Sequence, residues 1–593
     1  MKKRTADIII ETLVEKGIED CFLVVGGGAM HLDNALAKNE KIRKICNHHE
    51  QACAMAAEAY ARVSGNMAAV CVTSGPGATN AITGVMGAWQ DSIPMIIISG
   101  QVRYEISSMK TGLPLRYRGI QEFDIVTSVK NMTKYAVMVT DPLAVKAEVE
   151  KAIDIAMEGR RGPVWIDVPL DIQSSIVETN ELYKYEKKNI KNNLEIEKIN
   201  KIIEVLQKAE RPCILGGTGI VSAHLQKEFI DFVEKVKIPV VGGGWCTDMM
   251  NTEHELYFGL SGDIGPRTGN FIIQNADVIL VLGNSLSFRQ TGYAQDKFAV
   301  KARILWVDVD KYEAMKPGMK PEIFVNADLR EFLKYISNKN FSMPVSKEWM
   351  DYCRMLKKRF SPYESIENLE IDARVNSYYF WKVFDKYSTE NQVIAMGNSR
   401  GNAAKIQIGV QKKGQRALTN YLCGSMGYEL PAAIGAAIAT KQEIMCITGD
   451  GSIMMNLQEL QTIKQNNLPI KIAVFSNEGY EAIRQTCKNF FGGTYLGCTK
   501  DSGVSFPDFR KLAETFEFKY EKCSTNRDVD EKMKLFFEYN GNIFLEIKQQ
   551  INNPLIPKVM SRMKEDGTFE TPALHDMAPF LPEDEIKELM IGE

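Results

Sequence analysis

An acid and an amide end two neighbouring apolar runs in the segment ITGDGSIMMNLQELQTIKQNNLPIKIAVFSN, residues 447–477. The acid is Asp450, between Gly449 and Gly451, and the amide is Asn477, 27 positions further on. If the two runs are parallel strands joined by a crossover helix, both end at the same edge of the sheet, and adjacent strand ends lie roughly 5 Å apart. Carboxylate, amide and carbonyl oxygens suit Mg²⁺, and the flanking glycines let backbone N–H groups approach phosphates that share the metal. The spacing therefore predicts a metal and diphosphate site, although a turn and a helix cap would explain the same residues if they stood alone.

Length and composition limit the classes of protein that the chain can be. At 593 residues it is expected to form about three domains, and its 45% hydrophobic and 25% charged residues exclude a disordered or fibrous protein. The formal net charge of −3 offers no basic surplus for nucleic acid or an anionic membrane, so small molecules are the expected partners. Charged residues interrupt the N-terminal apolar stretch that a signal peptide would need, and no apolar run of about 18 residues follows. The 12 cysteines are scattered singly along the sequence. We expect a cytoplasmic protein with no membrane span, no disulfide bonds and no zinc.

Short apolar runs alternate with helical patterns in three parts of the chain, which is the rhythm of a parallel, doubly wound sheet. The strand-like runs are DCFLVV, AAVCVT, IPMIIIS and GPVWIDV in residues 1–175, PCILG, IPVVG, DVILVLG and RILWVDV in residues 201–335, and QVIAMG, EIMCITG, IKIAVFS and NIFLEIK in residues 373–549. The predicted fold class is therefore α/β, with three doubly wound parallel-sheet domains. Charged residues at 180–200 indicate a linker, and the tail at 550–593 is expected to wrap over a neighbouring part of the protein.

Three longer motifs resemble one family over nearly the whole chain. NHHEQACAMAAEAYARVSG (residues 47–65), VCVTSGPGATNAITGVMGAWQDSIPMIIISGQ (70–101) and GSMGYELPAAIGAA (424–437) resemble the acetolactate synthase group of thiamine diphosphate-dependent enzymes. The spacing from Asp450 to Asn477 resembles the thiamine diphosphate motif of the same enzymes. The resemblance implies a pyrimidine-binding domain first, a central Rossmann-like domain of the FAD-binding type, and a diphosphate-binding domain third. It also implies thiamine diphosphate and Mg²⁺ as cofactors, and a homodimer or tetramer, because in the family the cofactor lies between domains of two subunits.

The same resemblance implies a reaction. A carboligase of this kind decarboxylates pyruvate, or another 2-oxoacid, and transfers the two-carbon unit to an acceptor carbonyl such as that of a second 2-oxoacid. Two other functions stay open: a simple decarboxylase that releases an aldehyde, and a non-catalytic nucleotide-binding module. The decarboxylase would need a further general acid near the intermediate. The presence of Glu50 together with Asp450 and Asn477 argues against the non-catalytic module.

Site residues carry over from the family at matching positions. Glu50 would help the aminopyrimidine ring of the cofactor to remove a proton, and an apolar setting that raises its pKa would favour this exchange. Gln121 and Lys134 match the other catalytic positions, while His48 and His49 are expected to form hydrogen bonds. The metal ligands would be Asp450, Asn477 and the carbonyl of Gly479. The other expected cofactor contacts are Gly27, Gly397, Asn398, Ser399, Gly424, Met426, Gly449, Gly451, Ser452 and Tyr480.

Two departures from the family pattern concern the acceptor. Thr486 stands where biosynthetic acetolactate synthases carry a tryptophan, and Ile120 stands where they carry a phenylalanine before the active-site glutamine. Such changes in a pocket alter substrate preference by roughly 1–3 kcal/mol. Together with the tail segment DGTFETPALHDMAPFLPEDE, these changes resemble a subgroup of acetolactate synthase-like proteins of surface-polysaccharide pathways. The resemblance implies either a second 2-oxoacid or a keto-sugar nucleotide as the acceptor.

FAD is the cofactor that the resemblance leaves open. The residues at the family's flavin contacts are Gly216, Gly217, Gly259, Gly283, Arg289 and Asp308. Ser261 and Ser285, however, stand where a histidine and an arginine are usual. The sequence therefore predicts where FAD would bind, in the central domain, without deciding whether it binds.

Overall fold

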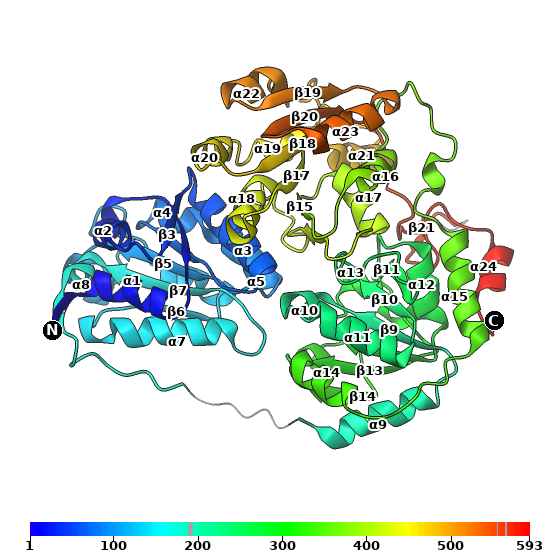
Figure 1. Ribbon diagram of the computed structural model, residues 1–593, viewed down its shortest axis with the longest axis horizontal. Coiled ribbons are helices and arrows are strands. Elements are labelled where there is room, and N and C mark those ends of the chain that lie inside the picture. The colour runs from blue at the N-terminus through cyan, green and yellow to red at the C-terminus, as the bar shows by residue number, and fades with distance from the viewer. Residues whose placement is uncertain (188–193, 554, 564–565, 593) are drawn as a thin grey trace.

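Three six-stranded parallel sheets flanked by helices make up the computed structural model of the protein (Figure 1). The structure describes residues 1–187, 194–553, 555–563 and 566–592, so part of the predicted linker lies outside the described residues. The predicted α/β class with three parallel-sheet domains is confirmed. Within the described residues, no helix has the length and apolar character needed to cross a membrane.

The first sheet has the strand order β3-β2-β4-β5-β7-β6, and all its pairs are parallel. Its strands are β2 (Asp20–Leu23), β3 (Arg43–Cys46), β4 (Ala69–Val72), β5 (Ile96–Gln101), β6 (Tyr135–Met138) and β7 (Val164–Pro169). Its helices are α1 (Thr5–Glu15), α2 (Met30–Lys38), α3 (Glu50–Ser64), α4 (Pro76–Asn80), α5 (Ile82–Gln90), α6 (Ile125–Val129), α7 (Val145–Met157) and α8 (Leu170–Ser174). A short antiparallel pair, β1 (Lys2–Arg4) with β8 (Ile176–Glu178), ties the two ends of this domain together.

The central sheet has the order β11-β10-β9-β12-β13-β14, which is the strand order of dinucleotide-binding folds. Its strands are β9 (Pro212–Gly216), β10 (Val240–Gly243), β11 (Tyr257–Ser261), β12 (Val278–Leu282), β13 (Arg303–Asp308) and β14 (Ile323–Asn326). Its helices are α9 (Ile196–Gln207), α10 (Thr218–Ser222), α11 (Gln226–Val236), α12 (Arg267–Asn275), α13 (Phe288–Thr291) and α14 (Leu329–Ser337). Helix α15 (Lys347–Arg359) and, from the tail, helix α24 (Glu583–Leu589) also contribute to the core of this domain. The remaining tail elements are the short strands β21 (Arg562–Met563) and β22 (Phe569–Glu570).

The third sheet has the order β16-β15-β17-β18-β20-β19, which repeats the strand order of the first sheet. Its strands are β15 (Val393–Met396), β16 (Arg416–Leu418), β17 (Ile444–Gly449), β18 (Ile470–Ser476), β19 (Lys519–Cys523) and β20 (Ile543–Lys548). Its helices are α16 (Ser377–Tyr387), α17 (Arg400–Ile408), α18 (Glu429–Thr440), α19 (Asp450–Ile453), α20 (Glu459–Gln465), α21 (Glu481–Phe490), α22 (Phe509–Thr515) and α23 (Val529–Glu538).

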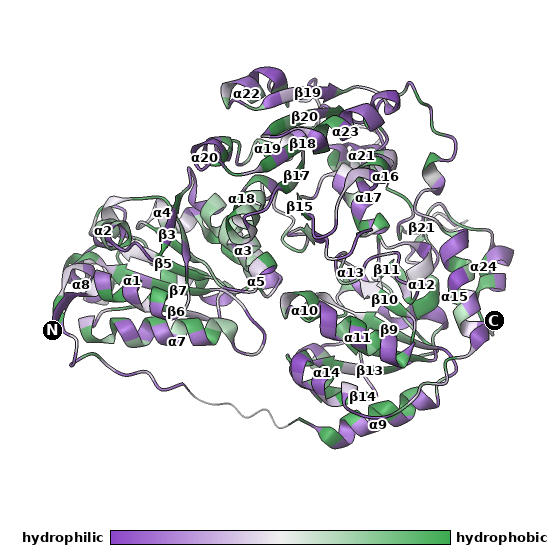
Figure 2. Cartoon of the chain, viewed as in Figure 1, coloured by the Kyte–Doolittle hydropathy of each residue, from purple (hydrophilic) through white to green (hydrophobic). Residues whose placement is uncertain are grey.

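Helices α3 and α18 join the first domain to the third. Both are rich in alanine, and their buried side chains share one apolar core with strands of both sheets. Their backbones come so close that a Cβ on Gly435 would lie 2.0 Å from the carbonyl oxygen of Ala56. Figure 2 shows apolar residues along the sheets and on these two helices, whereas outer helices such as α9 mix apolar and polar residues. Small side chains therefore let the backbones of α3 and α18 approach closely, which fixes the first domain against the third.

Candidate active site

The strand order of the third sheet reverses between β15 and β17, and ligands of parallel sheets bind in the crevice at such a point. The loop after β15 carries Gly397, Asn398 and Ser399, and the chain leaves β17 at Gly449. The two loops face each other, since a Cβ on Gly449 would lie 3.1 Å from the Cβ of Ser399. The residues predicted to meet a diphosphate therefore converge from two loops on one crevice.

Asp450 is the first residue of α19 and is 2% exposed. Strands β17 and β18 are adjacent and parallel, so Asp450 and Asn477 meet at the ends of neighbouring strands. The Asp450 Oδ2 accepts hydrogen bonds from the backbone N–H groups of Asn477 (2.9 Å) and Glu478 (2.7 Å). Burial nevertheless raises the pKa of this carboxyl to about 6, because its removal from water outweighs the N–H groups that stabilise the charge. A bound cation would offset that loss of hydration.

The oxygens around Asp450 fit a small, hard cation. The Asn477 Oδ1 accepts a hydrogen bond from Arg484 Nη2 at 3.0 Å, which leaves the second lone pair of this oxygen for a metal. Gly479 has no room for a side chain, because a Cβ there would lie 2.1 Å from the carbonyl oxygen of Cys498. In the part of the chain that the structure describes, no three His, Cys, Asp or Glu side chains gather into a metal centre. One carboxylate with an amide and a carbonyl oxygen is a set that suits Mg²⁺ shared with phosphate and water.

Side chains behind the two loops hold them in position. The Tyr480 ring lies over Gly451, where a Cβ would come within 2.1 Å of the ring. Ser399 caps α17 by accepting a hydrogen bond from the backbone N–H of Asn402 at 3.2 Å. Asn398, in contrast, makes only a long contact of 3.4 Å from its Nδ2 to Asn420. The loop after β17 is therefore held more tightly than the loop after β15.

Glu429 is a site residue that sequence reasoning missed. It begins α18, and its Oε2 accepts a hydrogen bond of 2.8 Å from the hydroxyl of Ser452. The same hydroxyl oxygen accepts a hydrogen bond of 2.8 Å from the backbone N–H of Gly427. The backbone N–H of Ser452, and not its hydroxyl, is therefore the group left for a ligand. An acid that begins the otherwise apolar helix ELPAAIGAAIA was the signal that could have identified Glu429.

Glu50, the predicted catalytic acid, is the first residue of α3 and is buried. Its Oε2 accepts a hydrogen bond of 3.0 Å from Asn80 Nδ2. The preceding His49 caps the helix, with Nδ1 accepting from the backbone N–H of Gln51 at 3.0 Å. Gln51 in turn accepts a hydrogen bond from Asn456 Nδ2 at 3.0 Å. The start of α3 is therefore tied to the segment that follows α19.

Asn456 extends this connection to the loop that precedes α18. Its Nδ2 also donates to the carbonyl oxygen of Gly427 at 2.8 Å, and the N–H of Gly427 binds Ser452. Gly424, with φ +66°, and the half-buried Met426 lie in the same loop. One series of hydrogen bonds thus joins the start of α3, the loop before α18 and the loop after β17.

Gly27 and Gln121 lie at the carboxyl edge of the first sheet. The chain turns after β2 at Gly27, and the backbone N–H of the next residue, Gly28, donates to Thr73 Oγ1 at 2.9 Å. Gln121 has φ +62°, and its carbonyl oxygen packs 2.5 Å from where a Cβ on Gly75 would lie. Glu50 follows β3 and shares this edge, so the structure places Gly27, Gln121 and Glu50 on the same side of the sheet.

Lys134 lies elsewhere. It directly precedes β6, and its backbone N–H bonds to the carbonyl of Pro163 at the start of β7, so it sits at the amino edge of the first sheet. Its amine donates to the carbonyl oxygen of Glu158, and burial lowers its pKa to about 8. Within one chain, Lys134 and Glu50 are therefore at opposite edges of the sheet.

Comparison with known proteins identifies the family of the chain. The model of the thiamine pyrophosphate enzyme N-terminal TPP binding domain matches residues 3–127, that of the central domain matches 199–336, and that of the C-terminal TPP binding domain matches 395–547. The chain belongs to the thiamine pyrophosphate enzyme family. Thiamine pyrophosphate is another name for thiamine diphosphate, so the protein is an enzyme with the predicted cofactor.

Named relatives of this thiamine pyrophosphate enzyme are acetolactate synthases. The chain is 30% identical to acetolactate synthase 2, chloroplastic, of Nicotiana tabacum over 583 residues, which cover 94% of the chain and 84% of the relative. It is 31% identical to the acetolactate synthase large subunit of Buchnera aphidicola, over 92% of the chain and 94% of the relative. A probable acetolactate synthase large subunit of Methanocaldococcus jannaschii is 30% identical, with 91% of both chains covered.

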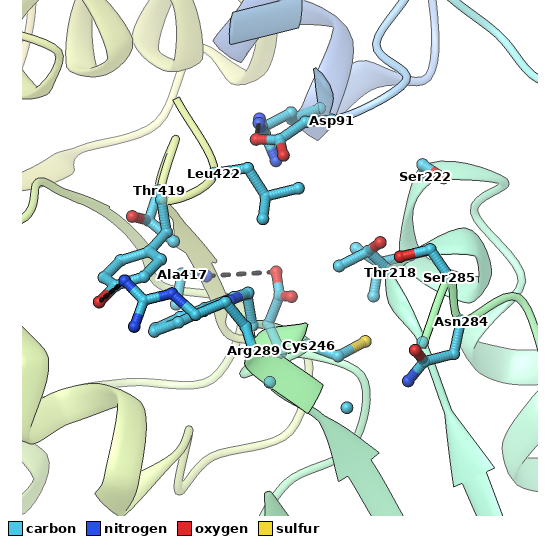
Figure 3. A pocket seen from close by; sticks show the side chains of 18 of the residues that line it. Asp91, Thr218, Ser222, Cys246, Asn284, Ser285, Arg289, Ala417, Thr419 and Leu422 are labelled. Carbon is cyan, nitrogen blue, oxygen red and sulfur yellow. Dashed lines mark hydrogen bonds and ion pairs between the residues drawn. The ribbon is translucent and has the colours of Figure 1, made fainter. Parts of the chain in front are cut away.

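The central domain of this thiamine pyrophosphate enzyme borders a cavity on which all three domains converge (Figure 3). Two adjoining pockets, of about 920 and 970 Å³, share five lining residues, Asp91, Thr218, Ser222, Ser285 and Leu422. Of the residues at predicted flavin contacts, Gly217, Gly283, Arg289 and Asp308 line these pockets. The cavity lies at the carboxyl edge of the central sheet, where a dinucleotide is expected.

The two ends of this cavity differ in how well they fit FAD. At one end, the glycines at the ends of β9 and β12 let the backbones approach closely, since a Cβ on Gly217 would lie 2.1 Å from the carbonyl oxygen of Gly283. The buried Asp308, whose pKa burial raises to about 6, lines the same end and offers a carboxyl group to a polar ligand. At the other end, Trp245 stacks on Tyr421 with ring centroids 3.2 Å apart. The residues therefore fit the nucleotide half of FAD, but the flavin ring does not fit unless this stacked pair separates.

Proposed function

We propose that this thiamine pyrophosphate enzyme decarboxylates pyruvate, or a similar small 2-oxoacid, and transfers the two-carbon unit to the carbonyl of a second substrate. The observation that carries the proposal is the hydrogen-bonded series from Gln51 through Asn456 and Gly427 to Ser452. It ties the predicted pyrimidine acid, Glu50, to the loops predicted to bind the diphosphate. The similarity to acetolactate synthases supports the same reaction class.

The proposed roles of the residues follow from their positions. Asp450, Asn477 and the carbonyl of Gly479 would hold Mg²⁺, and backbone N–H groups of the loops after β15 and β17 would bind the diphosphate. When bound, thiamine diphosphate supplies a nucleophilic carbon and accepts the electron pair that decarboxylation releases. Glu50 would exchange a proton with the aminopyrimidine ring at a carboxyl oxygen, and Asn80 would orient that carboxyl through the hydrogen bond at 3.0 Å.

The acceptor substrate is the part of the function in which this chain is expected to differ from the family that it resembles. Thr486 lies on the exposed side of α21, where its hydroxyl donates to the Ala482 carbonyl at 3.0 Å. Ile120 is 90% exposed. Neither residue builds the aromatic wall that packs around a small acceptor in the family, so we propose a second 2-oxoacid, or a bulkier keto-sugar nucleotide, as the acceptor.

We also propose a homodimer as the minimum assembly. Large apolar side chains are exposed on the loop before α6 and around the end of α21, namely Leu113, Leu115, Tyr117, Ile120, Phe490, Phe491 and Leu496. Exposed apolar groups of this size mark contact surfaces, and a second subunit would cover them. Sedimentation of the protein at micromolar concentration would contradict the proposal if only monomer were found. A cytoplasmic location stays a prediction.

One experiment tests the reaction. The protein is incubated with pyruvate, thiamine diphosphate and Mg²⁺, and carbon dioxide and acetolactate are measured separately, with Asp450→Ala as the control that lacks the predicted metal ligand. Carbon dioxide and acetolactate in equal amounts support pyruvate as the acceptor. Carbon dioxide without acetolactate points to another acceptor, which adding a keto-sugar nucleotide would identify, or to plain decarboxylation. If no carbon dioxide forms from any 2-oxoacid, the proposed reaction is wrong.

A further inference from the structure

Glu429 combines features that a structural side chain does not need. It is 1% exposed, yet it carries a carboxyl group at the start of an otherwise apolar helix. Its Oε2 has the Ser452 hydroxyl as a partner and the Thr448 hydroxyl also stabilises its charge, but its Oε1 is buried and makes no hydrogen bond of normal geometry among the described residues. An unpaired buried oxygen costs roughly 1–3 kcal/mol. An apolar side chain of similar size would avoid that cost.

The unpaired oxygen lies against the other predicted diphosphate loop. A Cβ on Gly397 would come within 1.8 Å of the Glu429 Oε1, so the carboxyl group occupies the space beside that glycine. Through Oε2 and Ser452, the same carboxyl group reaches the loop after β17 and the backbone N–H of Gly427. Glu429 therefore contacts the loops after β15 and β17 directly and is linked to the loop before α18 through Ser452.

The protonation state of Glu429 suits a side chain that lies beside a bound anion. Burial raises its pKa to about 7, so near neutral pH a large share of the carboxyl is neutral. The titratable group that it affects on β17 is the Cys446 thiol. The acids on the other elements packed against α18 are engaged elsewhere, since Glu58 of α3 binds Tyr428, Glu459 of α20 binds Asn47, and Asp450 of α19 accepts from backbone N–H groups.

We propose that Glu429 is a positioning residue for the diphosphate of the cofactor, which acts as a neutral acid and holds the three loops at the spacing that the diphosphate needs. This inference rests on the proposed function, because it assumes that the diphosphate binds at these loops. An anion nearby disfavours the ionised carboxyl, so binding is accompanied by proton uptake. The affinity for thiamine diphosphate then falls as the pH rises through the pKa of Glu429.

The test compares Glu429→Gln and Glu429→Leu with the unaltered protein. Thiamine diphosphate affinity is measured with Mg²⁺ by calorimetry between about pH 6 and pH 8.5. For the unaltered protein, the Kd is expected to rise up to about tenfold per pH unit above the pKa. Glu429→Gln stays neutral and keeps both hydrogen-bonding groups, so its Kd is expected to match at low pH and to lack this rise. Glu429→Leu is expected to bind at least about tenfold more weakly at every pH, because the loops lose their link.

Glu459→Gln is the matched control, since Glu459 is also a buried acid that begins a helix of this domain, but its carboxyl is partnered by Asn47 and His48. It should keep the pH dependence of the unaltered protein. The proposal is wrong if Glu429→Gln shows that same dependence and Glu429→Leu binds with unchanged affinity. Should Glu429→Leu fail to fold, as judged by its melting curve, the Glu429→Gln comparison decides alone. If the unaltered protein binds no thiamine diphosphate at any pH, the proposed function fails instead.

Discussion

The third and central sheets end in two crevices of the same kind, with different contents. At the third sheet, glycine loops and two buried acids, Asp450 and Glu429, converge on the point where the strand order reverses. At the central sheet, the corresponding point opens into a cavity in which side chains pair with one another, as Trp245 does with Tyr421. Topology therefore locates a ligand site, whereas the residues at the strand ends decide which ligand can enter.

The largest expected effect separates the two crevices by their strand-end acids, Asp450 and Asp308. Asp450→Ala removes the only carboxylate of the predicted metal site and should weaken thiamine diphosphate binding by roughly 100-fold or more, which is about 3 kcal/mol. Asp308→Ala is the matched control at the central crevice and should leave this affinity unchanged. Calorimetric titration with Mg²⁺ present measures both. Equal losses of affinity in the two variants would mean that thiamine diphosphate binding does not depend on the third-sheet crevice alone.

Glu50→Gln tests the other half of the third-sheet site. The amide has nearly the same shape and can still bond to Asn80, but it cannot exchange a proton with the aminopyrimidine ring. Turnover at saturating cofactor should fall by roughly 100-fold, while the Kd for thiamine diphosphate stays near that of the unaltered protein. Initial rates of carbon dioxide release, with the Kd measured in parallel, check this. Activity of Glu50→Gln within a few-fold of that of the unaltered protein would show that Glu50 does not exchange this proton.

The central crevice can be tested with FAD. The stacked pair of Trp245 and Tyr421 occupies the ring end, so the unaltered protein should gain no flavin absorbance after incubation with FAD and desalting. Trp245→Ala removes the indole and should bind FAD about tenfold more tightly than the unaltered protein, since room for the ring is regained. A purified protein that already carries stoichiometric flavin would show that the pair separates readily, and that both crevices hold cofactors.

The smallest expected effect concerns the acceptor. A pocket without the two aromatic walls should bind 2-oxobutyrate little better than pyruvate, because one added methylene contributes only about 0.8 kcal/mol even when it is fully buried. A competition at equal concentrations, with products resolved by mass, measures the preference. A tenfold or greater excess of acetohydroxybutyrate over acetolactate would show that other side chains rebuild the lost wall.

The inner strands of the sheets could be predicted from sequence, and the edge strands could not. All twelve predicted strands are inner strands of the three six-stranded sheets, whereas the six strands of these sheets that were missed, β3, β6, β11, β14, β16 and β19, are the two edges of each sheet. Edge strands pair on one side only and need no long apolar run. RKIC in β3 and KYEKC in β19 show this, with charged residues among the apolar ones.

The site residues also divide into those that could be placed from the sequence and those that could not. Asp450 and Asn477 could be placed together because one βαβ unit brings their strands side by side. Glu429 could not be assigned, since it acts on residues of another loop, and only the tertiary fold brings those loops together. Arg484 bonds to Asn477 only seven residues earlier, on the helix that follows the same loop, but its residue type gave no signal of this contact. Lys134 matched a motif, yet its place at the amino edge depends on the direction of β6, a strand that was not predicted.

The close contact between α3 and α18 also has a consequence for how the chain folds. Ala56 and Gly435 touch although they are 379 positions apart (435 − 56), with the whole central domain between them. A contact that closes so long a loop forms late, after the first and third domains have each acquired their own sheets. The last event in the folding of one chain is then the docking of two finished domains, which must precede the pairing of two chains in the proposed homodimer.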